Sequence, residues 1–357
     1  MLLEGDARCP ERGVTIRLLA EEDRRHWDEY VVNSATSSGY HLSGWKDVIE
    51  DSFGHRTYYL FAEDSESRIK GVLPLVHMKS LLFGNFVVSL PYFNYGGVCA
   101  DDDEISKSLL KAAVDIATDI NADHIELRHT RPASNGLPAK THKVSMRLTL
   151  PADPEELWLS FPSKLRSQIR RPAREEMYSR LGGEEELESF FDVFSTNMRD
   201  LGTPVYSRKF FSNILRKFPD KTRISTIYSK GGEPVASGFL FGFKETLEIP
   251  WASSLRCFSQ YSPNMLLYWN VLKYACENNY RVFDFGRSTA GEGTYRFKEQ
   301  WGAKPVQLYW NFWMKNVGPL PELNPKNPKY QTAIKIWQKL PIGLTRLIGP
   351  RVVKNIP

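Results

Sequence analysis

Two stretches of the chain repeat one order of apolar and polar segments. Each reads as two apolar strands joined by a polar turn, a third strand that contains or runs into a proline, an amphipathic helix and a fourth strand. The first stretch places them at residues 57–62, 69–78, 86–90, 104–120 and 124–128. The second places them at residues 223–229, 234–243, 246–253, 264–276 and 281–285. The shared order predicts an internal structural repeat, although few residues are identical.

Such a unit has an α+β arrangement, because the helix between the last two strands makes a parallel crossover in an otherwise antiparallel sheet. We therefore expect two similar domains with mixed central sheets, at residues 15–150 and 151–315. The second domain includes a last aromatic strand, predicted as a single element at residues 306–313. Residues 316–357 follow as a basic amphipathic tail.

Basic side chains crowd into one predicted helix that precedes the second repeat unit. The stretch from Lys164 to Arg174 carries five basic residues and no acidic one. Arg166 and Arg170 lie four positions apart and so share a helix face. Two interpretations fit this pattern: an ordinary solvated helix face, or a surface that contacts the phosphates of a substrate.

The C-terminal tail combines basic and apolar residues. Residues 326–357 contain no acidic residue, and their seven basic residues exceed the net charge of +5 of the whole chain. Such a segment suits either peripheral contact with an anionic membrane surface or a terminal helix that docks on the domains and is shortened by prolines. The basic residues are Lys326, Lys329, Lys335, Lys339, Arg346, Arg351 and Lys354.

Cysteine usage and hydropathy indicate the cellular compartment in which we expect the protein. The four cysteines are scattered, with no Cys-x-x-Cys spacing and no cysteine–histidine cluster, so we expect no structural metal site and no cofactor. Free thiols are typical of the reducing cytoplasm. The N-terminus lacks the pattern of a signal peptide, and no apolar run approaches the ~18 residues of a membrane span. We therefore expect a cytoplasmic protein that contacts the inner membrane, if at all, through its tail.

The most distinctive stretch is residues 283–305, which read FDFGRSTAGEGTYRFKEQWGAKP. It begins as an apolar strand interrupted by Asp284, passes through a glycine-containing loop and leaves through aromatic residues interleaved with Arg296 and Lys298. A cation that emerges from an apolar wall is costly to bury unless an anion meets it. Both cations are therefore candidates for binding a phosphate, a carboxylate or a developing oxyanion. Alternatively, the aromatic residues are core and Lys298 is an ordinary surface charge.

Several segments together resemble the FemAB family, and more narrowly the FemAB-related proteins of bacterial exopolysaccharide and PEP-CTERM gene clusters. They are FPSKLRSQIRRPA at 161–173, GTPVYSRKFF at 202–211, IPWASSL at 249–255 and the stretch 283–305. The likeness covers roughly residues 15–315. It implies two tandem acyltransferase domains of the GNAT type. In well-studied members of the family, an amino acid passes from aminoacyl-tRNA to an amine of a peptidoglycan precursor.

The resemblance assigns the family's Phe-Lys pair to Phe297 and Lys298, whose lysine would steady negative charge on the donor and in the transition state. Aminolysis of an ester or thioester passes through an oxyanion, which a fixed cation stabilises. GNAT enzymes hold the pyrophosphate of acyl-CoA with a glycine-containing loop, but residues 254–264 contain no glycine. The long helical hairpin of tRNA-using members is also absent. The donor therefore stays open between aminoacyl-tRNA and acyl-CoA or an acyl carrier.

The candidates for binding the acceptor are Tyr206, Arg208, Trp251 and Arg287. The two arginines suit a phosphate or a carboxylate, and ordinary surface pairing is their alternative. Asp284 is the best-placed candidate for a general base, because it alternates with two phenylalanines and so faces away from them. Further candidates are Glu248, Glu292 and Glu299.

These features favour an acyltransferase that moves an aminoacyl or acyl group to an amine of a cell-envelope precursor, in peptidoglycan or exopolysaccharide synthesis. The expected partners are an acyl donor and an amine-bearing precursor. The alternative is a catalytically silent GNAT-like module that binds a ligand in exopolysaccharide assembly. An RNA-binding protein fits less well, because the basic residues lack the interleaved aromatic residues on which bases stack.

Overall fold

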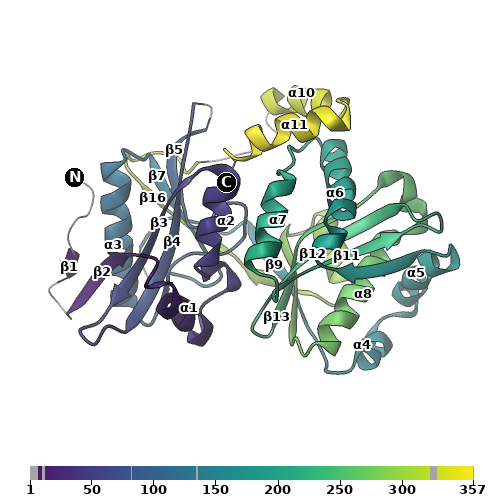
Figure 1. Ribbon diagram of the computed structural model, residues 1–357, viewed down its shortest axis with the longest axis horizontal. Coiled ribbons are helices and arrows are strands. Elements are labelled where there is room, and N and C mark those ends of the chain that lie inside the picture. The colour runs from purple at the N-terminus through teal and green to yellow at the C-terminus, as the bar shows by residue number, and fades with distance from the viewer. Residues whose placement is uncertain (1–6, 10–12, 82, 134–135, 322–327, 357) are drawn as a thin grey trace. The chain divides into compact units, whose positions relative to one another are not determined.

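The computed structural model of the protein describes residues 7–9, 13–81, 83–133, 136–321 and 328–356 (Figure 1). These residues divide into two compact units, each with its own mixed sheet. Unit 1 holds the described residues of Met1–Lys143, Gln307–Glu322 and Asn355–Pro357. Unit 2 holds those of Val144–Val306 and Leu323–Lys354. The expected α+β class with two mixed central sheets is therefore confirmed.

The sheet of unit 1 contains the first copy of the repeat. Its strands run in the order β1-β2-β3-β4-β5-β7-β16-β8, and β6 pairs with β4. The strands are β1 (Ala7–Cys9), β2 (Val14–Leu18), β3 (Arg56–Glu63), β4 (Ile69–Ser80), β5 (Gly84–Val88), β6 (Cys99–Ala100), β7 (His124–His129), β8 (Ala139–Lys140) and β16 (Tyr309–Met314). The helices are α1 (Arg24–Asn33), α2 (Gly44–Phe53) and α3 (Asp103–Asp119).

The sheet of unit 2 contains the second copy. Its strands run in the order β10-β11-β12-β13-β14-β9-β15. They are β9 (Lys143–Thr149), β10 (Tyr178–Gly182), β11 (Thr222–Tyr228), β12 (Pro234–Phe243), β13 (Thr246–Ser254), β14 (Val282–Thr289) and β15 (Lys304–Gln307). The helices are α4 (Pro154–Ser160), α5 (Ser163–Arg174), α6 (Leu187–Leu201), α7 (Arg208–Lys217), α8 (Pro263–Glu277), α9 (Gly293–Glu299), α10 (Pro328–Trp337) and α11 (Ile342–Val353).

The predicted repeat is present in both sheets. In unit 1, β3, β4 and β5 pair antiparallel, and α3 then crosses over to place β7 parallel to β5. In unit 2, β11, β12 and β13 pair antiparallel, and α8 places β14 parallel to β13. Each crossover helix buries an apolar stripe on its sheet, which is why the 3.6-residue periodicity of the sequence located both helices.

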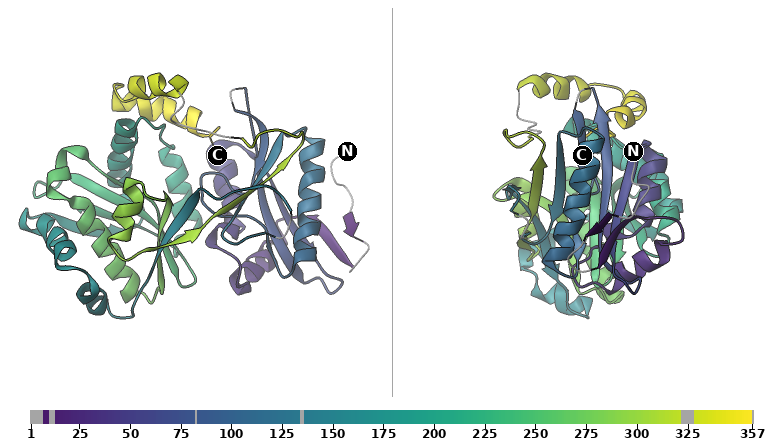
Figure 2. Two further views of the ribbon diagram at one scale, coloured as in Figure 1. Left: turned by 180° about the vertical axis from the view of Figure 1, so that it is seen from behind. Right: turned by 90° about the vertical axis from the view of Figure 1, so that its left-hand side faces the viewer.

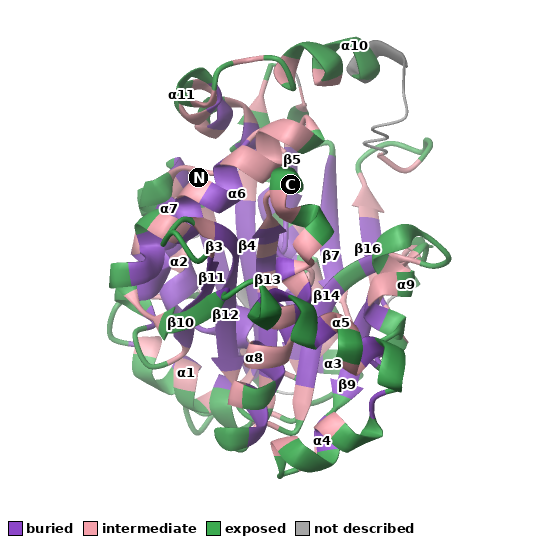
Figure 3. Cartoon of the chain, turned by 90° about the vertical axis from the view of Figure 1, so that its right-hand side faces the viewer, coloured by how far each residue is buried: buried purple, intermediate pink, exposed green. Residues whose placement is uncertain are grey.

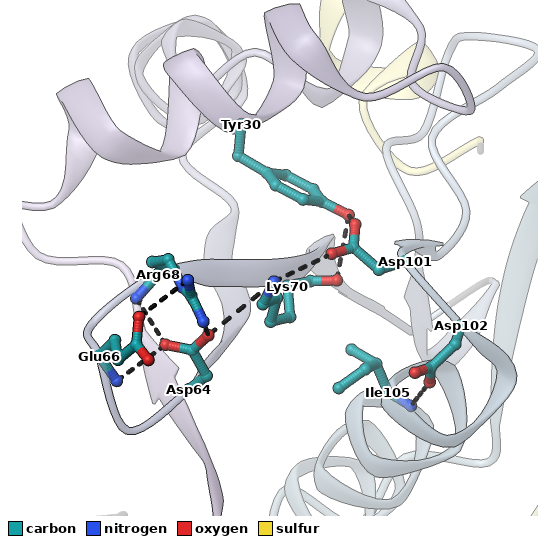
Figure 4. A network of polar contacts seen from close by, with 8 residues as sticks. All are labelled: Tyr30, Asp64, Glu66, Arg68, Lys70, Asp101, Asp102 and Ile105. Atoms are coloured by element: carbon teal, nitrogen blue, oxygen red, sulfur yellow. Dashed lines mark hydrogen bonds and ion pairs between the residues drawn. The ribbon is translucent and has the colours of Figure 1, made fainter.

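In unit 1, polar contacts join α1, the turn between β3 and β4, and the residues just before α3 (Figure 4). The hydroxyl group of Tyr30 on α1 lies 2.9 Å from a carboxylate oxygen of Asp101, and the ammonium group of Lys70 lies 3.7 Å from the other. The next residue, Asp102, caps α3, because its carboxylate accepts a hydrogen bond from the amide of Ile105 at 2.8 Å. These polar groups are bonded to one another, so we assign the cluster to the fold and not to a ligand-binding site.

One strand from each half of the chain completes the sheet of the other half. β9 follows the first repeat in sequence but lies beside β14 in unit 2. β16 follows the second repeat but pairs antiparallel with β7 in unit 1 (Figure 2). The predicted contiguous domains, 15–150 and 151–315, therefore differ from the observed units, which are discontinuous.

The single strand predicted at residues 306–313 is wrong, because the chain breaks pairing at Leu308. There the amide of Leu308 donates a hydrogen bond to the carbonyl group of Lys143 at 3.1 Å. The side-chain amide of Gln307 donates to the carbonyl groups of Thr141 and Lys143 at 2.7 and 2.9 Å. The residues before this point form β15 in unit 2, and those after it form β16 in unit 1.

The tail forms α10 and α11 in unit 2, and α11 packs against α6. The docking interpretation of the tail is therefore confirmed. Lys326 and the side chain of Lys329 lie outside the described residues. Within the described part of the chain, every helix is too short or too polar to cross a membrane.

The parallel pair of unit 1 diverges, and its own side chains fill the opening. The register of β5 and β7 ends at Val88 and Glu126. Beyond it, the buried guanidinium of Arg128 donates to the Glu126 carboxylate at 2.7 Å and to the carbonyl group of Phe93 at 2.6 Å. Arg128 also lies over the ring of Trp310 on β16, 4.5 Å from its centroid. Because these partners hold Arg128 inside unit 1, we assign it a role in the stability of the fold.

We predict that Arg128→Met lowers the free energy of unfolding by about 3–5 kcal/mol, because it leaves the Glu126 carboxylate buried and unpaired. Urea denaturation measures this change. The matched control is Arg25→Met, since Arg25 is exposed and pairs with Glu29 only at the surface, and we expect a change within about 0.5 kcal/mol. Equal losses in the two variants would contradict the structural role of Arg128.

Candidate active site

The central strands of unit 2 diverge in the same way as those of unit 1. The parallel register of β13 and β14 covers three pairs and ends at Glu248 and Asp284. Next to this point β13 carries a bulge, since Phe239 pairs with Trp251 whereas Phe241 pairs with Glu248. Beyond the last pair, main-chain groups of β13 that face β14 are not used by the ladder between these two strands. Such an opening between central strands can present main-chain N–H groups of residues 250–253 to a ligand, Pro250 excepted because it has no N–H group.

Asp284 is the charged residue at the point of divergence and is only 1% exposed. Its neighbours Phe283 and Phe285 point into the core beneath α8, so its carboxylate faces the other side of the sheet. One oxygen accepts hydrogen bonds from the Ser145 hydroxyl at 2.5 Å and from the Gly286 amide at 2.8 Å. The other accepts from Nε of Arg147 at 3.0 Å. These donors hold the carboxylate in one position and keep its charge balanced.

Gly286 links the fixed carboxylate to a binding place for a cation, which is formed by main-chain carbonyl groups. Its φ of +76° lies in the left-handed region that favours glycine. Successive carbonyl groups of a regular strand point to opposite sides, but here those of Gly286 and Arg287 both accept hydrogen bonds from Nζ of Lys298, at 2.9 and 3.0 Å. Lys298 comes from α9, so the loop between β14 and α9 closes on itself through this side chain.

Lys298 is 8% exposed, and burial is the main reason that its pKa falls from the usual 10.5 to about 8. The negative charges of Asp284 and Glu248 raise this pKa, and the charge of Arg287 lowers it further. Burying the ammonium group costs stability below pH 8. That cost is relieved as the pH rises from 8 towards 10.5, because the folded protein releases the proton before the unfolded chain does.

Phe297 supports Lys298 by packing. Its ring lies 5.1 Å from that of Tyr268 on α8 and 6.4 Å from that of Trp301. Trp301 in turn meets Phe161, at the start of α5, at 5.5 Å. The apolar side of α9 is therefore anchored in the core, and both interpretations of residues 283–305 hold in part: the aromatic residues are core, and Lys298 is buried rather than a surface charge.

Tyr206 and Trp251 lie together on the side of the sheet covered by α6 and α7. Trp251 packs against Phe211 at 5.1 Å and lies 6.2 Å from the half-buried ring of Tyr206. The bulge directs Trp251 to the same side as its partner Phe239, which it meets at 5.6 Å. Trp251 is thus a core residue beside the diverging strands, and Tyr206 forms the edge of its cluster.

The predicted basic residues lie in three places. Arg287 and Arg296 are exposed near the Lys298 loop. Arg208 is exposed at the start of α7 and pairs with Glu188 at 2.7 Å, as in its surface-pairing alternative. On α5, Arg166 is half-buried and the exposed Arg170 lies over the ring of Trp158 at 5.0 Å. Among the described contacts, none joins Arg208, Arg166 or Arg170 to Lys298.

The segment before α8 folds as a short 3-10 helix, Arg256–Tyr261. The amides of Phe258 and Ser262 donate to the carbonyl groups of Leu255 and Ser259, both at 3.1 Å. Ser262 itself has a φ of +57°. Two amides at this end of α8 are therefore engaged within the chain, where a glycine-containing loop would present amides to a pyrophosphate.

Sequence reasoning missed Ser145 and Arg147, which hold Asp284 from β9. The signal was available: on this strand they alternate with the buried residues Met146 and Leu148, so they share the opposite face. What the pattern could not supply was their partner, which lies more than a hundred positions away in sequence. Among the described residues, no three histidine, cysteine, aspartate or glutamate side chains gather where they could hold a metal ion.

We predict that Asp284→Asn lowers the pKa of Lys298 below 8, because the carboxylate charge that favours the ammonium form is removed. The pH dependence of Lys298 acetylation by acetic anhydride, followed by peptide mass spectrometry, measures this pKa. The exposed Lys273 is the internal control and should react equally in both proteins. An unchanged pH dependence at Lys298 would show that Asp284 does not act on it.

Comparison with known proteins agrees with this architecture. Residues 160–299 match a family model described as an acetyltransferase (GNAT) domain. A search of curated proteins gives no match. Among solved structures, FemX is similar with a TM-score of 0.66 at 14% sequence identity, covering 83% of this chain and 96% of FemX.

Two further structures share the fold over their whole length. L-PGS from Bacillus licheniformis gives a TM-score of 0.57 at 14% identity, covering 93% of this chain and 98% of L-PGS. A tandem GNAT protein from the clavulanic acid biosynthesis pathway gives 0.53 at 13% identity, covering 86% of this chain and 100% of its own. Residues 160–299 therefore match an acetyltransferase (GNAT) domain, and the chain as a whole has a GNAT-like fold similar to that of tandem GNAT proteins.

Proposed function

We propose that the protein is an acyltransferase of the FemAB type, which transfers an aminoacyl or acyl group to an amine of a cell-envelope precursor. The GNAT domain supports acyltransferase activity in general. The observation that carries the proposal is the buried Lys298 ammonium group, held by two carbonyl groups beside the diverging strands β13 and β14. The similarity of the fold to FemX and the sequence likeness to the FemAB family support the narrower assignment.

In this proposal Lys298 stabilises the oxyanion of acyl transfer. A neutral amine attacks the carbonyl carbon of the donor, and the carbonyl oxygen gains negative charge while the nitrogen becomes positively charged. The intermediate then collapses: the C–O or C–S bond breaks, and the proton lost by the nitrogen passes to the departing oxygen or sulfur, which leaves as the alcohol or thiol. Two of the three N–H groups of Lys298 are bonded to Gly286 and Arg287. The third is left for the oxyanion. Because the ammonium group is fixed in a poorly hydrated place, it stabilises this charge without reorganising.

Asp284 is assigned to positioning rather than to the general base that its sequence position suggested. Both of its oxygens already accept hydrogen bonds, and it is nearly inaccessible. It fixes the Gly286 amide, and that peptide fixes the carbonyl groups that hold Lys298. An acceptor amine that arrives neutral needs no base on the enzyme.

For the donor, we assign Arg166 and Arg170 on α5 to contact with phosphates. α5 carries basic residues without acidic ones and packs against α8. Through Phe161 the start of α5 also touches Trp301, directly after α9. Arg296 and the exposed Arg287 lie nearer to Lys298 and suit the phosphate or carboxylate of the acceptor. Tyr206 is assigned to apolar contact with the acceptor, and the core residue Trp251 supports it from behind.

The cell-envelope setting completes the proposal. A precursor made at the inner face of the membrane places the enzyme in the cytoplasm, and none of the three described cysteines, Cys99, Cys257 and Cys276, forms a disulfide. An origin among the FemAB-related proteins of exopolysaccharide and PEP-CTERM gene clusters fits the same setting. Contact of the tail with an anionic membrane is a separate proposal, which the exposed side of α10 and α11 supports.

We predict that Lys298→Ala lowers the rate of acyl transfer about 100-fold or more while leaving the fold intact. Transfer from aminoacyl-tRNA or acetyl-CoA to small amine acceptors is the assay. The matched control is Lys273→Ala, an exposed lysine on α8, which should keep full activity. Equal activity of the Lys298 variant and the wild type would refute the oxyanion role.

The pH profile distinguishes the two chemical roles of a lysine with a pKa of about 8. If its cation stabilises the oxyanion, activity falls as the pH rises through 8, because the ammonium group loses its proton. Lys298→Arg would then retain activity into more alkaline solution, since arginine stays charged. Activity that instead rises through pH 8 in the wild type but not in Lys298→Arg would make neutral Lys298 a base and overturn this assignment, whereas a rise in both proteins reports deprotonation of the acceptor amine.

Donor binding separates the enzyme from its alternative. We predict saturable binding of aminoacyl-tRNA, weakened about tenfold or more by the double change Arg166→Glu and Arg170→Glu, because phosphate contacts are lost. Lys230→Glu is the control, as Lys230 is an exposed residue paired with Glu176. Binding of acetyl-CoA alone would reassign the donor. Binding and transfer with neither donor would favour the silent module of exopolysaccharide assembly.

A further inference from the structure

The two tail helices expose a surface that is both apolar and basic. Ile336, Leu344 and Leu347 are 58%, 39% and 62% exposed, so all three belong to the exposed large apolar residues of the described chain. Four exposed basic residues lie near them in sequence: Lys335, Lys339, Arg351 and Lys354. We call this set the outer tail face: Lys335, Ile336, Lys339, Leu344, Leu347, Arg351 and Lys354. Figure 3 shows α10 and α11 drawn mostly green and pink, in contrast to the purple strands.

The opposite side of α11 is fixed to the protein. Thr345, Gly349 and Val353, spaced four apart, are its buried residues. A side chain at Gly349 would lie 2.9 Å from the main chain of Val205, so the helix rests directly on that segment. Arg346 adds hydrogen bonds to the Ser195 hydroxyl at 2.9 Å and the Asp192 carboxylate at 2.6 Å on α6.

α10 is held in the same way. The side-chain amide of Gln338 donates to the carbonyl group of Asp200 at 3.1 Å. Ile334 packs on Gly202 at the end of α6, where a Cβ atom would come within 2.4 Å of it. Both helices therefore present their outer residues from a fixed position, so docking of the tail and contact with an external partner are compatible.

The charge of the outer tail face indicates the chemistry of that partner. The described tail, residues 328–356, contains no acidic residue. Of its basic residues, Arg346 is half-buried and pairs with Asp192, whereas Lys335, Lys339, Arg351 and Lys354 are exposed. Branched aliphatic side chains between cations fit the boundary between anionic head groups and acyl chains. A protein interface would have a core depleted in charge, and a nucleic acid would call for exposed aromatic residues.

We propose that the outer tail face binds the surface of an anionic phospholipid bilayer. Ile336, Leu344 and Leu347 enter the head-group boundary, and Lys335 and Lys339 meet lipid phosphates. The face lies on α10, α11 and the residues that directly follow each helix, all in unit 2, the unit that carries Lys298. The proposal stands apart from the catalytic one, since it concerns where the protein resides and not what it transfers.

Sedimentation of the full chain with lipid vesicles tests this proposal. We expect binding to vesicles that contain phosphatidylglycerol and phosphatidylcholine in equal amounts, weaker binding as salt is added, and little binding to phosphatidylcholine alone. The double variant Lys335→Glu and Lys339→Glu should bind about 25-fold more weakly or worse, roughly fivefold for each cation lost. Leu344→Ser with Leu347→Ser should also weaken binding several-fold.

Two control variants change the same residue types elsewhere in unit 2. Leu159→Ser removes an apolar residue that is 63% exposed on α4, and Lys230→Glu reverses an exposed charge. Both should bind vesicles as the wild type does, and urea denaturation checks that every variant folds. Equal binding to neutral and anionic vesicles, no binding, or equal loss in control and tail variants would each overturn the proposal. So would loss of binding to an RNA oligonucleotide, rather than to vesicles, in the tail variants.

Discussion

A buried carboxylate on the central strand of unit 2 constrains everything around it. Asp284 needs several donors because it is almost fully removed from water. It finds them in two side chains of β9 and in the amide of Gly286. Satisfying this charge ties a strand that arrives from the first half of the chain to the turn that leads into α9. The position of Lys298 is thus a consequence of where Asp284 is satisfied.

The two units show how one fold carries different roles. Both contain a parallel pair that diverges after two or three residue pairs. In unit 1 the opening is occupied by Arg128, whose partners are Glu126 and the carbonyl group of Phe93. In unit 2 the corresponding strand continues into Gly286 and the carbonyl groups that hold a lysine. A duplicated architecture therefore need not carry duplicated chemistry, which resides in particular side chains.

The sequence predicted the elements whose formation depends on local hydrophobic periodicity. The crossover helices predicted at 104–120 and 264–276 occur at Asp103–Asp119 and Pro263–Glu277, because each buries a continuous apolar stripe. Lys298 stood out because its aromatic neighbours left a cation in an apolar setting. The exchange of β9 and β16 was not predictable in this way, since the apolar pattern of a strand does not say which of two sheets it joins. Nor could spacing show that Arg208 pairs with Glu188 or that Ser145 meets Asp284.

The strand exchange determines when the sheet of unit 1 can be completed as the chain is synthesised. β7 obtains its partner β16 only after all of the second repeat has been made, since β16 begins at Tyr309. Until then a nascent chain carries β7 as an open sheet edge, the kind of surface on which chains aggregate. A gene cut between the two repeats would leave each product without a strand of its own sheet. Evolution could therefore reshape the halves of this protein separately, but it could not easily separate them.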